Sequence, residues 1–196
     1  MKKFLFIFSV LLMSFTMSKD NPIDRIGVTG PLMFNQVSYN LAWSNKPRDT
    51  YYIQEYLPEG QNVNSFSQML TIHLFDVDIT IEDAVKNKIN ELENRIKTDA
   101  TCNYEVYKSP DGKEIIIDFT LGESKNNEMT IAEFNIYRYR NIELGNNRNG
   151  LLVYAYSERS YGEKIQEFYK SLKTERPELI SMMSLSELPV ISLSKE

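Results

Sequence analysis

The stretch SPDGKEIIIDFTL, residues 109–121, decides the fold of this 196-residue chain. Its first four residues, Ser109 to Gly112, are a strong signal for a hairpin turn. Every second residue from Ile115 to Leu121 is apolar, which places one apolar face along an extended chain. The sequence therefore predicts a strand over 114–121 that pairs antiparallel with a short strand over Tyr104–Lys108.

Further strands are predicted on both sides of this hairpin. They cover Leu32–Trp43, Tyr51–Leu57, Met69–Phe75, Ile131–Ile142 and Leu151–Ser157. Polar turns separate them, at residues Asn45–Asp49, Pro58–Gly60, Gly122–Glu128 and Asn141–Gly150. Short strands joined by turns of this kind predict an antiparallel sheet.

Two amphipathic helices complete the pattern. Thr80 can cap the first, with Asp83 three residues later as in a capping box. Its apolar stripe is Ile81, Val85, Ile89, Leu92 and Ile96. The second helix begins at Ser160 or Gly162, with the apolar stripe Ile165, Phe168, Tyr169 and Leu172. Pro177 predicts a break near Glu175–Arg176, followed by a further short helix within Glu178–Leu188.

The predicted fold class is α+β, an antiparallel β-sheet covered by two main amphipathic helices. The element order, and the stretch Tyr-x-x-x-Tyr-Leu-Pro-Glu-Gly at 52–60 that precedes Met-Leu-Thr-Ile at 69–72, resemble the PsbP-like proteins. The stretch also resembles a set of small exported bacterial proteins without an established activity. The resemblance covers about residues 32–188 and implies an αβα sandwich. Its members do unrelated jobs, so it implies no function and maps no functional residue onto this chain.

The N-terminus is typical of a secretory signal peptide. Lys2 and Lys3 precede a nearly uninterrupted apolar run, Phe4–Met13, and Thr16 and Ser18 suit a cleavage after residue 18. The run is shorter than the roughly 20 residues that cross a membrane. An uncleaved anchor or a buried hydrophobic arm is the alternative. We expect a signal peptide at 1–18, a flexible segment at 19–31, one α+β domain at 32–188 and a loose tail at 189–196.

These features predict an exported bacterial protein, periplasmic or secreted, without a transmembrane anchor after cleavage. The net charge of −5 argues against nucleic-acid partners, which need a basic face. Cys102 is the single cysteine, so an intramolecular disulfide is excluded. Phosphate loops, dinucleotide fingerprints, nucleophile elbows and metalloprotease motifs are absent from the sequence, so no cofactor is predicted and a non-enzyme is favoured.

His73 is the single histidine and the one candidate for general base catalysis, with Asp76 or Asp78 as an orienting acid. A half-buried strand histidine is the simpler interpretation. Cys102 would need His73 as its base, and we expect it to be a small buried residue instead. One histidine and one cysteine are too few for a zinc site, and Asp76 and Asp78 lack the calcium-loop pattern, so no metal site is predicted.

Arg138 and Arg140 alternate with Tyr137 and Tyr139, so both arginines point to one face of a strand. Such a pair could clamp a carboxylate or a phosphate, or could form ion pairs with neighbouring acids. Arg138, Arg140 and His73 are thus the weak candidates for a binding site. The first hypothesis is a non-catalytic binding or assembly-accessory module with an unidentified protein partner or small ligand. The alternative is a small hydrolase or transferase that uses His73 with a nearby carboxylate.

Overall fold

The computed structural model describes residues 22–145 and 148–193, so the predicted signal peptide at 1–18 lies outside the described residues. The elements in chain order are β1 (Leu32–Phe34), β2 (Val37–Arg48), β3 (Tyr51–Leu57), β4 (Gln68–Phe75), α1 (Ile81–Ile96), β5 (Asn103–Lys108), β6 (Glu114–Lys125), β7 (Glu128–Glu143), β8 (Asn149–Tyr161), a 3₁₀ turn (Gly162–Lys164) and α2 (Ile165–Leu185).

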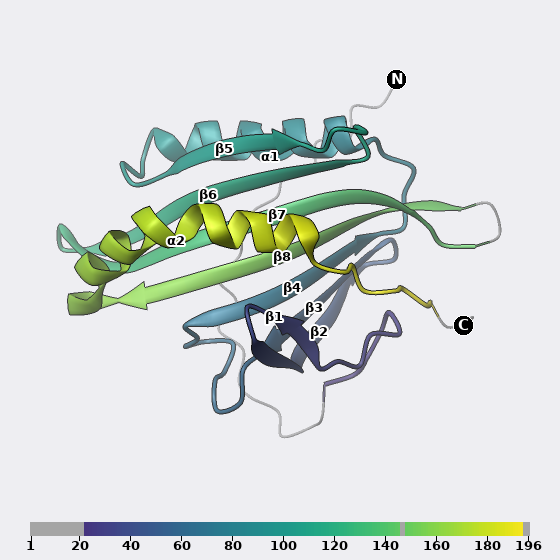
Figure 1. Ribbon diagram of the computed structural model, residues 1–196, viewed down its shortest axis with the longest axis horizontal. Helices are drawn as coiled ribbons and strands as arrows, with labels where there is room; N and C mark the ends of the chain where they lie inside the picture. Colours follow the sequence, from purple (N-terminus) through teal and green to yellow (C-terminus); the bar gives the residue numbers. More distant parts are fainter. Residues whose placement is uncertain (1–21, 146–147, 194–196) are drawn as a thin grey trace.

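All eight strands form one curled antiparallel sheet, in the order β1-β2-β3-β4-β8-β7-β6-β5 (Figure 1). The two halves of the chain meet where β4 pairs with β8, in the register His73 opposite Val153. The central strands β4 and β8 are almost wholly buried. The antiparallel pairing predicted from the turns is therefore confirmed.

Two tight hairpins were not predicted at the positions where they occur. Asn35–Gln36 joins β1 to β2, so the single strand predicted over 32–43 is wrong. Asn126–Asn127 joins β6 to β7, which leaves only two residues of the predicted turn at 122–128 outside the strands. All four residues have φ between 47° and 64°, the left-handed conformation of the hairpin turns that match the sheet twist.

Helix α1 agrees with its sequence pattern. The Thr80 side chain accepts a hydrogen bond from the Asp83 backbone N–H at 3.1 Å and donates to the Asp83 carboxylate at 2.9 Å. The side chains of Ile81, Val85 and Leu92 are buried against the sheet. The predicted cap is therefore confirmed, and so is the inward stripe as far as Leu92, whereas Ile96 at the end of the predicted stripe is 40% exposed.

Helix α2 continues through Pro177, so the break predicted at residues 175–176 is wrong. Leu172, Leu179 and Met183 are buried and extend one apolar seam past the proline. Arg176 also holds the middle of the helix to the sheet, by donating to the fully buried Asp118 of β6 at 2.5 Å. Packing on both sides of Pro177 outweighs the backbone hydrogen bond that proline cannot donate.

The sandwich predicted from the sequence is also wrong. The curled sheet makes up most of the molecule, and the two helices do not cover it: α1 packs on β5–β7 and α2 packs on β7 and β8, against opposite faces (Figure 1). A helix about 10 Å wide, lying along strands spaced about 4.8 Å apart, covers two or three strands. A sheet of eight strands is too wide for two such helices, whose main contacts are with β5–β8.

Two segments near the ends of the described chain cover the α2 face where no helix lies. The Tyr56 hydroxyl and the Gln54 amide both donate to the Val28 carbonyl, at 2.6 and 3.2 Å. The Ser192 backbone N–H donates to the Ile26 carbonyl at 2.8 Å. Ile26 and Val28 are buried in the same core as α2. These segments are the described parts of those expected to be flexible at 19–31 and loose at 189–196, and they pack together over β3 and β4.

Candidate functional site

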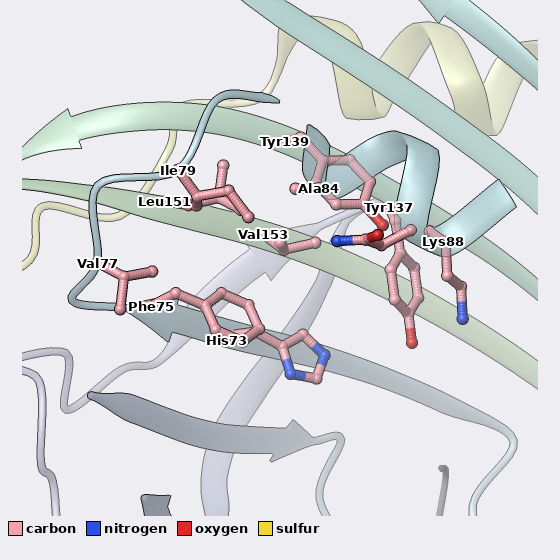
Figure 2. A pocket seen from close by; sticks show the side chains of 11 residues that line it. His73, Phe75, Val77, Ile79, Ala84, Lys88, Tyr137, Tyr139, Leu151 and Val153 are labelled. Atoms are coloured by element: carbon pink, nitrogen blue, oxygen red, sulfur yellow. The ribbon is translucent and has the colours of Figure 1, made fainter. Parts of the chain in front are cut away.

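A small cavity lies on the opposite face, between the first half of α1 and the sheet. Its volume is about 50 Å³, and the connection from β4 to α1 closes one end of it (Figure 2). The lining is almost entirely apolar. It consists of His73, Phe75, Val77, Ile79, Ala84, Asn87, Lys88, Tyr137, Tyr139, Leu151 and Val153. The cavity holds a few heavy atoms, the size of one aliphatic side chain, whereas pockets for drug-sized ligands measure about 300–1,000 Å³.

His73 lines this cavity from β4. Its Nδ1 lies 2.9 Å from the hydroxyl of Tyr51 on β3, and its ring stacks with that of Tyr51. Burial, and secondly the positive charge of Lys88, lower the pKa of His73 to about 3. The imidazole is therefore neutral at neutral pH and a weak base.

The acids expected to orient His73 do not contact its Nδ1. Tyr51 occupies that side of the ring, and Arg148 donates to the Asp76 carboxylate at 2.6 Å. Cys102 is buried beneath α1, where its thiol donates to the Leu92 carbonyl at 3.8 Å and burial raises its pKa. Within residues 22–145 and 148–193, no three His, Cys, Asp or Glu side chains come together as metal ligands.

Lys88 is a buried cation at the mouth of the cavity. Its side chain is only 6% exposed, and its Nζ lies 3.0 Å from the Glu91 carboxylate. The ammonium also lies over the rings of Phe119 and Tyr137, 4.6 and 5.1 Å from their centroids. Figure 2 shows Lys88, Tyr137 and His73 side by side along the open side of the cavity. The site therefore combines an apolar floor with a polar rim.

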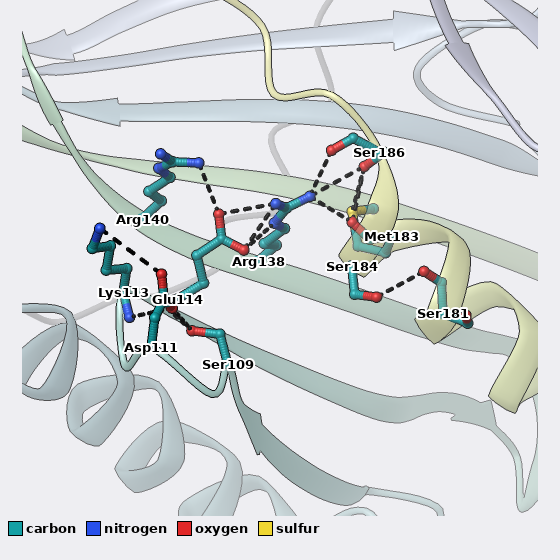
Figure 3. A network of polar contacts seen from close by, with 10 residues as sticks. All are labelled: Ser109, Asp111, Lys113, Glu114, Arg138, Arg140, Ser181, Met183, Ser184 and Ser186. Carbon is teal, nitrogen blue, oxygen red and sulfur yellow. Dashed lines mark hydrogen bonds and ion pairs between the residues drawn. The ribbon is translucent and has the colours of Figure 1, made fainter.

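The predicted arginine pair lies on the other face and serves the fold. Arg138 is buried, and it binds Glu114 through Nε and NH2, both at 2.9 Å (Figure 3). Its NH1 donates to the carbonyls of Met183 and Ser186, at 2.7 and 2.8 Å, and so caps the end of α2. Arg140 donates to the same Glu114 at 3.0 Å. Both side chains point away from the faces of Tyr137 and Tyr139, as the alternation predicted, but no empty clamp lies between them.

Three residues at or near the cavity were not identified from the sequence: Lys88 lines it, Tyr51 contacts His73, and Glu55 lies on the same face of β3 as Tyr51. Lys88 falls three residues after Val85 and four before Leu92, so it interrupts the apolar stripe of α1. Glu55 is a charge within the β-forming run YYIQEYL. In both cases the signal was a charged residue at a position where the helix or strand periodicity predicts a buried apolar side chain.

The chain belongs to a protein family whose model matches residues 26–188, and no function is attached to that family. None of the curated proteins matches the chain. Within the described residues, none of the helices combines the length and the apolarity that a membrane span requires.

Proposed function

We propose that the protein is an exported, non-catalytic binding module, and that the cavity beside α1 takes one apolar side chain of a protein partner. The observation that carries the proposal is the cavity itself, an apolar recess that a few heavy atoms fill. Interfaces draw much of their binding energy from such anchors, which insert one apolar side chain into a desolvated pocket. The size of the cavity favours a side chain over a drug-sized ligand.

Export is supported by the signal-like sequence at 1–18, and the acidic net charge of −5 suits a soluble exported protein. The catalytic alternative has less support. His73 is buried, its pKa is about 3, and its Nδ1 contacts a tyrosine. A general base is most effective when its pKa lies near the working pH.

The test fills the cavity and asks whether a partner is lost. Ala84 lines the cavity from α1, and leucine is a good helix former, so Ala84→Leu fills the recess with little cost to the helix. Lys86→Leu, exposed on the same helix, is the matched control. Each protein is immobilised and exposed to the periplasm or medium of its own cells, and the captured proteins are identified by mass spectrometry.

We expect the unmodified protein and Lys86→Leu to recover the same stoichiometric partner, and Ala84→Leu to lose it. Recovery of that partner by all three proteins would place its binding surface elsewhere. If no protein is captured while a metabolite raises the melting temperature of the unmodified protein, the ligand is a small molecule and the proposal fails.

A further inference from the structure

Next to the cavity, β3 carries a glutamate that no cation of the described residues neutralises. Glu55 lies directly opposite Thr71 of β4 and Trp43 of β2, two residues along the strand from the pair Ile53 and His73. Residues directly opposite in an antiparallel sheet share a face, so Glu55 lies on the face of the cavity. Within residues 22–145 and 148–193, its carboxylate has neither a hydrogen bond nor an ion pair.

The strand register places Glu55 on the same face of β3 as Tyr51, whose hydroxyl contacts His73 of the cavity lining. Burial raises the pKa of Glu55 to about 7. Burial also raises the pKa of Tyr51, and the negative charge of Glu55 adds to that effect. The carboxylate therefore lies near the His73 end of the cavity and is only partly hydrated.

The nearby cations are bound to other acids. Arg159 lowers the pKa of Glu55 slightly, but it donates to Glu133 at 2.7 Å and packs over the Phe66 ring. Lys88 is held by Glu91. Glu55 therefore remains available as an acceptor for a donor from outside the protein.

We propose that Glu55 binds the ammonium or guanidinium group of a basic residue in the partner, adjacent to the apolar side chain that occupies the cavity. The inference rests on the proposed function and names the chemistry of the partner: an exposed segment in which an aliphatic residue neighbours Lys or Arg. The acidic net charge of the chain favours such a segment at long range. A charge-assisted hydrogen bond at a partly dehydrated carboxylate changes affinity by about tenfold or more.

The test uses two blocked dipeptides as probes, acetyl-Leu-Lys-amide and acetyl-Leu-Gln-amide. Binding to the purified protein is followed by NMR, from the methyl signals of Ala84 and Val153, at pH 8 so that Glu55 is charged. We expect the lysine probe to bind about tenfold more tightly than the glutamine probe. Glu55→Gln should abolish this preference, and Glu128→Gln, an exposed change of equal charge at the start of β7, should keep it.

The outcomes separate the two proposals. A preference that survives in Glu55→Gln overturns the role of Glu55 alone, provided that Ala84→Leu still abolishes binding of both probes. Binding that Ala84→Leu leaves unchanged, or an absence of methyl shifts with either probe, overturns the cavity proposal and this inference together. Isopentylamine serves as a third probe, and if it binds as tightly as acetyl-Leu-Lys-amide, the ligand is a free amine and not a partner chain.

Discussion

Replacing Arg138 with methionine should destabilise the fold by about 3–5 kcal/mol, the cost of breaking a buried ion pair from one side. Methionine keeps an unbranched apolar stem in place of the arginine methylenes and removes the five donors of the guanidinium group. Glu114, whose side chain is 15% exposed, would lose its bidentate partner and keep only Arg140. The Ser186 carbonyl would lose this donor at the end of α2, and an unsatisfied acceptor costs about 1–3 kcal/mol where it is buried, whereas the Met183 carbonyl would keep the Ser186 hydroxyl at 2.9 Å.

The double variant Arg138→Met with Glu114→Met should recover a large part of this loss, because it removes the stranded carboxylate as well. Urea unfolding of the unmodified protein, Arg138→Met, Glu114→Met and the double variant forms a double-mutant cycle, which gives the coupling energy between the two side chains. For a domain of this size, a loss of 3–5 kcal/mol lowers the melting temperature by roughly 10 °C. A loss below 1 kcal/mol in Arg138→Met would refute the structural role and return Arg138 to the candidates for ligand binding.

Three further predictions follow from buried groups on the sheet. Glu55→Gln should be more stable than the unmodified protein above pH 7, by up to about 3 kcal/mol, and equally stable below pH 4.5. The reason is that the carboxyl pKa is higher in the folded state, so ionisation of Glu55 opposes folding as the pH rises. Urea unfolding at pH 4.5 and 8 measures the difference. The pKa of His73 is 6.5 when unfolded and about 3 when folded, so stability should fall as the pH drops below 6.5; His73→Gln should lack this loss, about 3 kcal/mol at pH 4.5, and an equal loss in both proteins would contradict it. Gly122→Ala should cost about 1–3 kcal/mol in thermal unfolding, because a Cβ there would meet the Thr101 hydroxyl that holds Asp99. Gly112→Ala on the open β5–β6 turn meets no neighbour, so it should cost only the backbone strain of its positive φ of 71°.

The parts of the fold that local chemistry controls could be predicted from the sequence. Helix α1 could be predicted from the Thr80 cap and the apolar stripe that begins at Ile81. The β5–β6 hairpin could be predicted from the turn at Ser109 to Gly112. In both cases, the residues that signal the element and the residues they contact lie close together in the sequence. Pro177 shows the opposite case. Its local signal for a helix end is correct chemistry, but the packing of Leu179 and Met183 against a distant sheet decides the outcome.

The candidate site depended on long-range pairing and could not be assembled in the same way. Tyr51 and His73 are 22 residues apart, and only the β3–β4 register brings the hydroxyl to Nδ1. Arg138 was correctly assigned to the face opposite Tyr137 by alternation, which depends on neighbouring residues only. The partners of Arg138 could not be predicted in this way, because Glu114 and Met183 lie 24 and 45 residues from it in the sequence.

The topology explains why the site lies where it does. On the α2 face, the segments around Ile26 and Ser192 seal the part of the sheet that the helix leaves uncovered. On the α1 face, β3 and β4 carry Glu55, Thr71 and His73, polar residues among apolar strands, and Thr71 and His73 are buried. Burial of Glu55 opposes folding at neutral pH, and Arg159, which is paired with Glu133, offsets that cost only in part. A charge that lowers stability and borders a cavity is better explained by binding than by folding, because perturbed titratable groups concentrate where proteins contact their ligands.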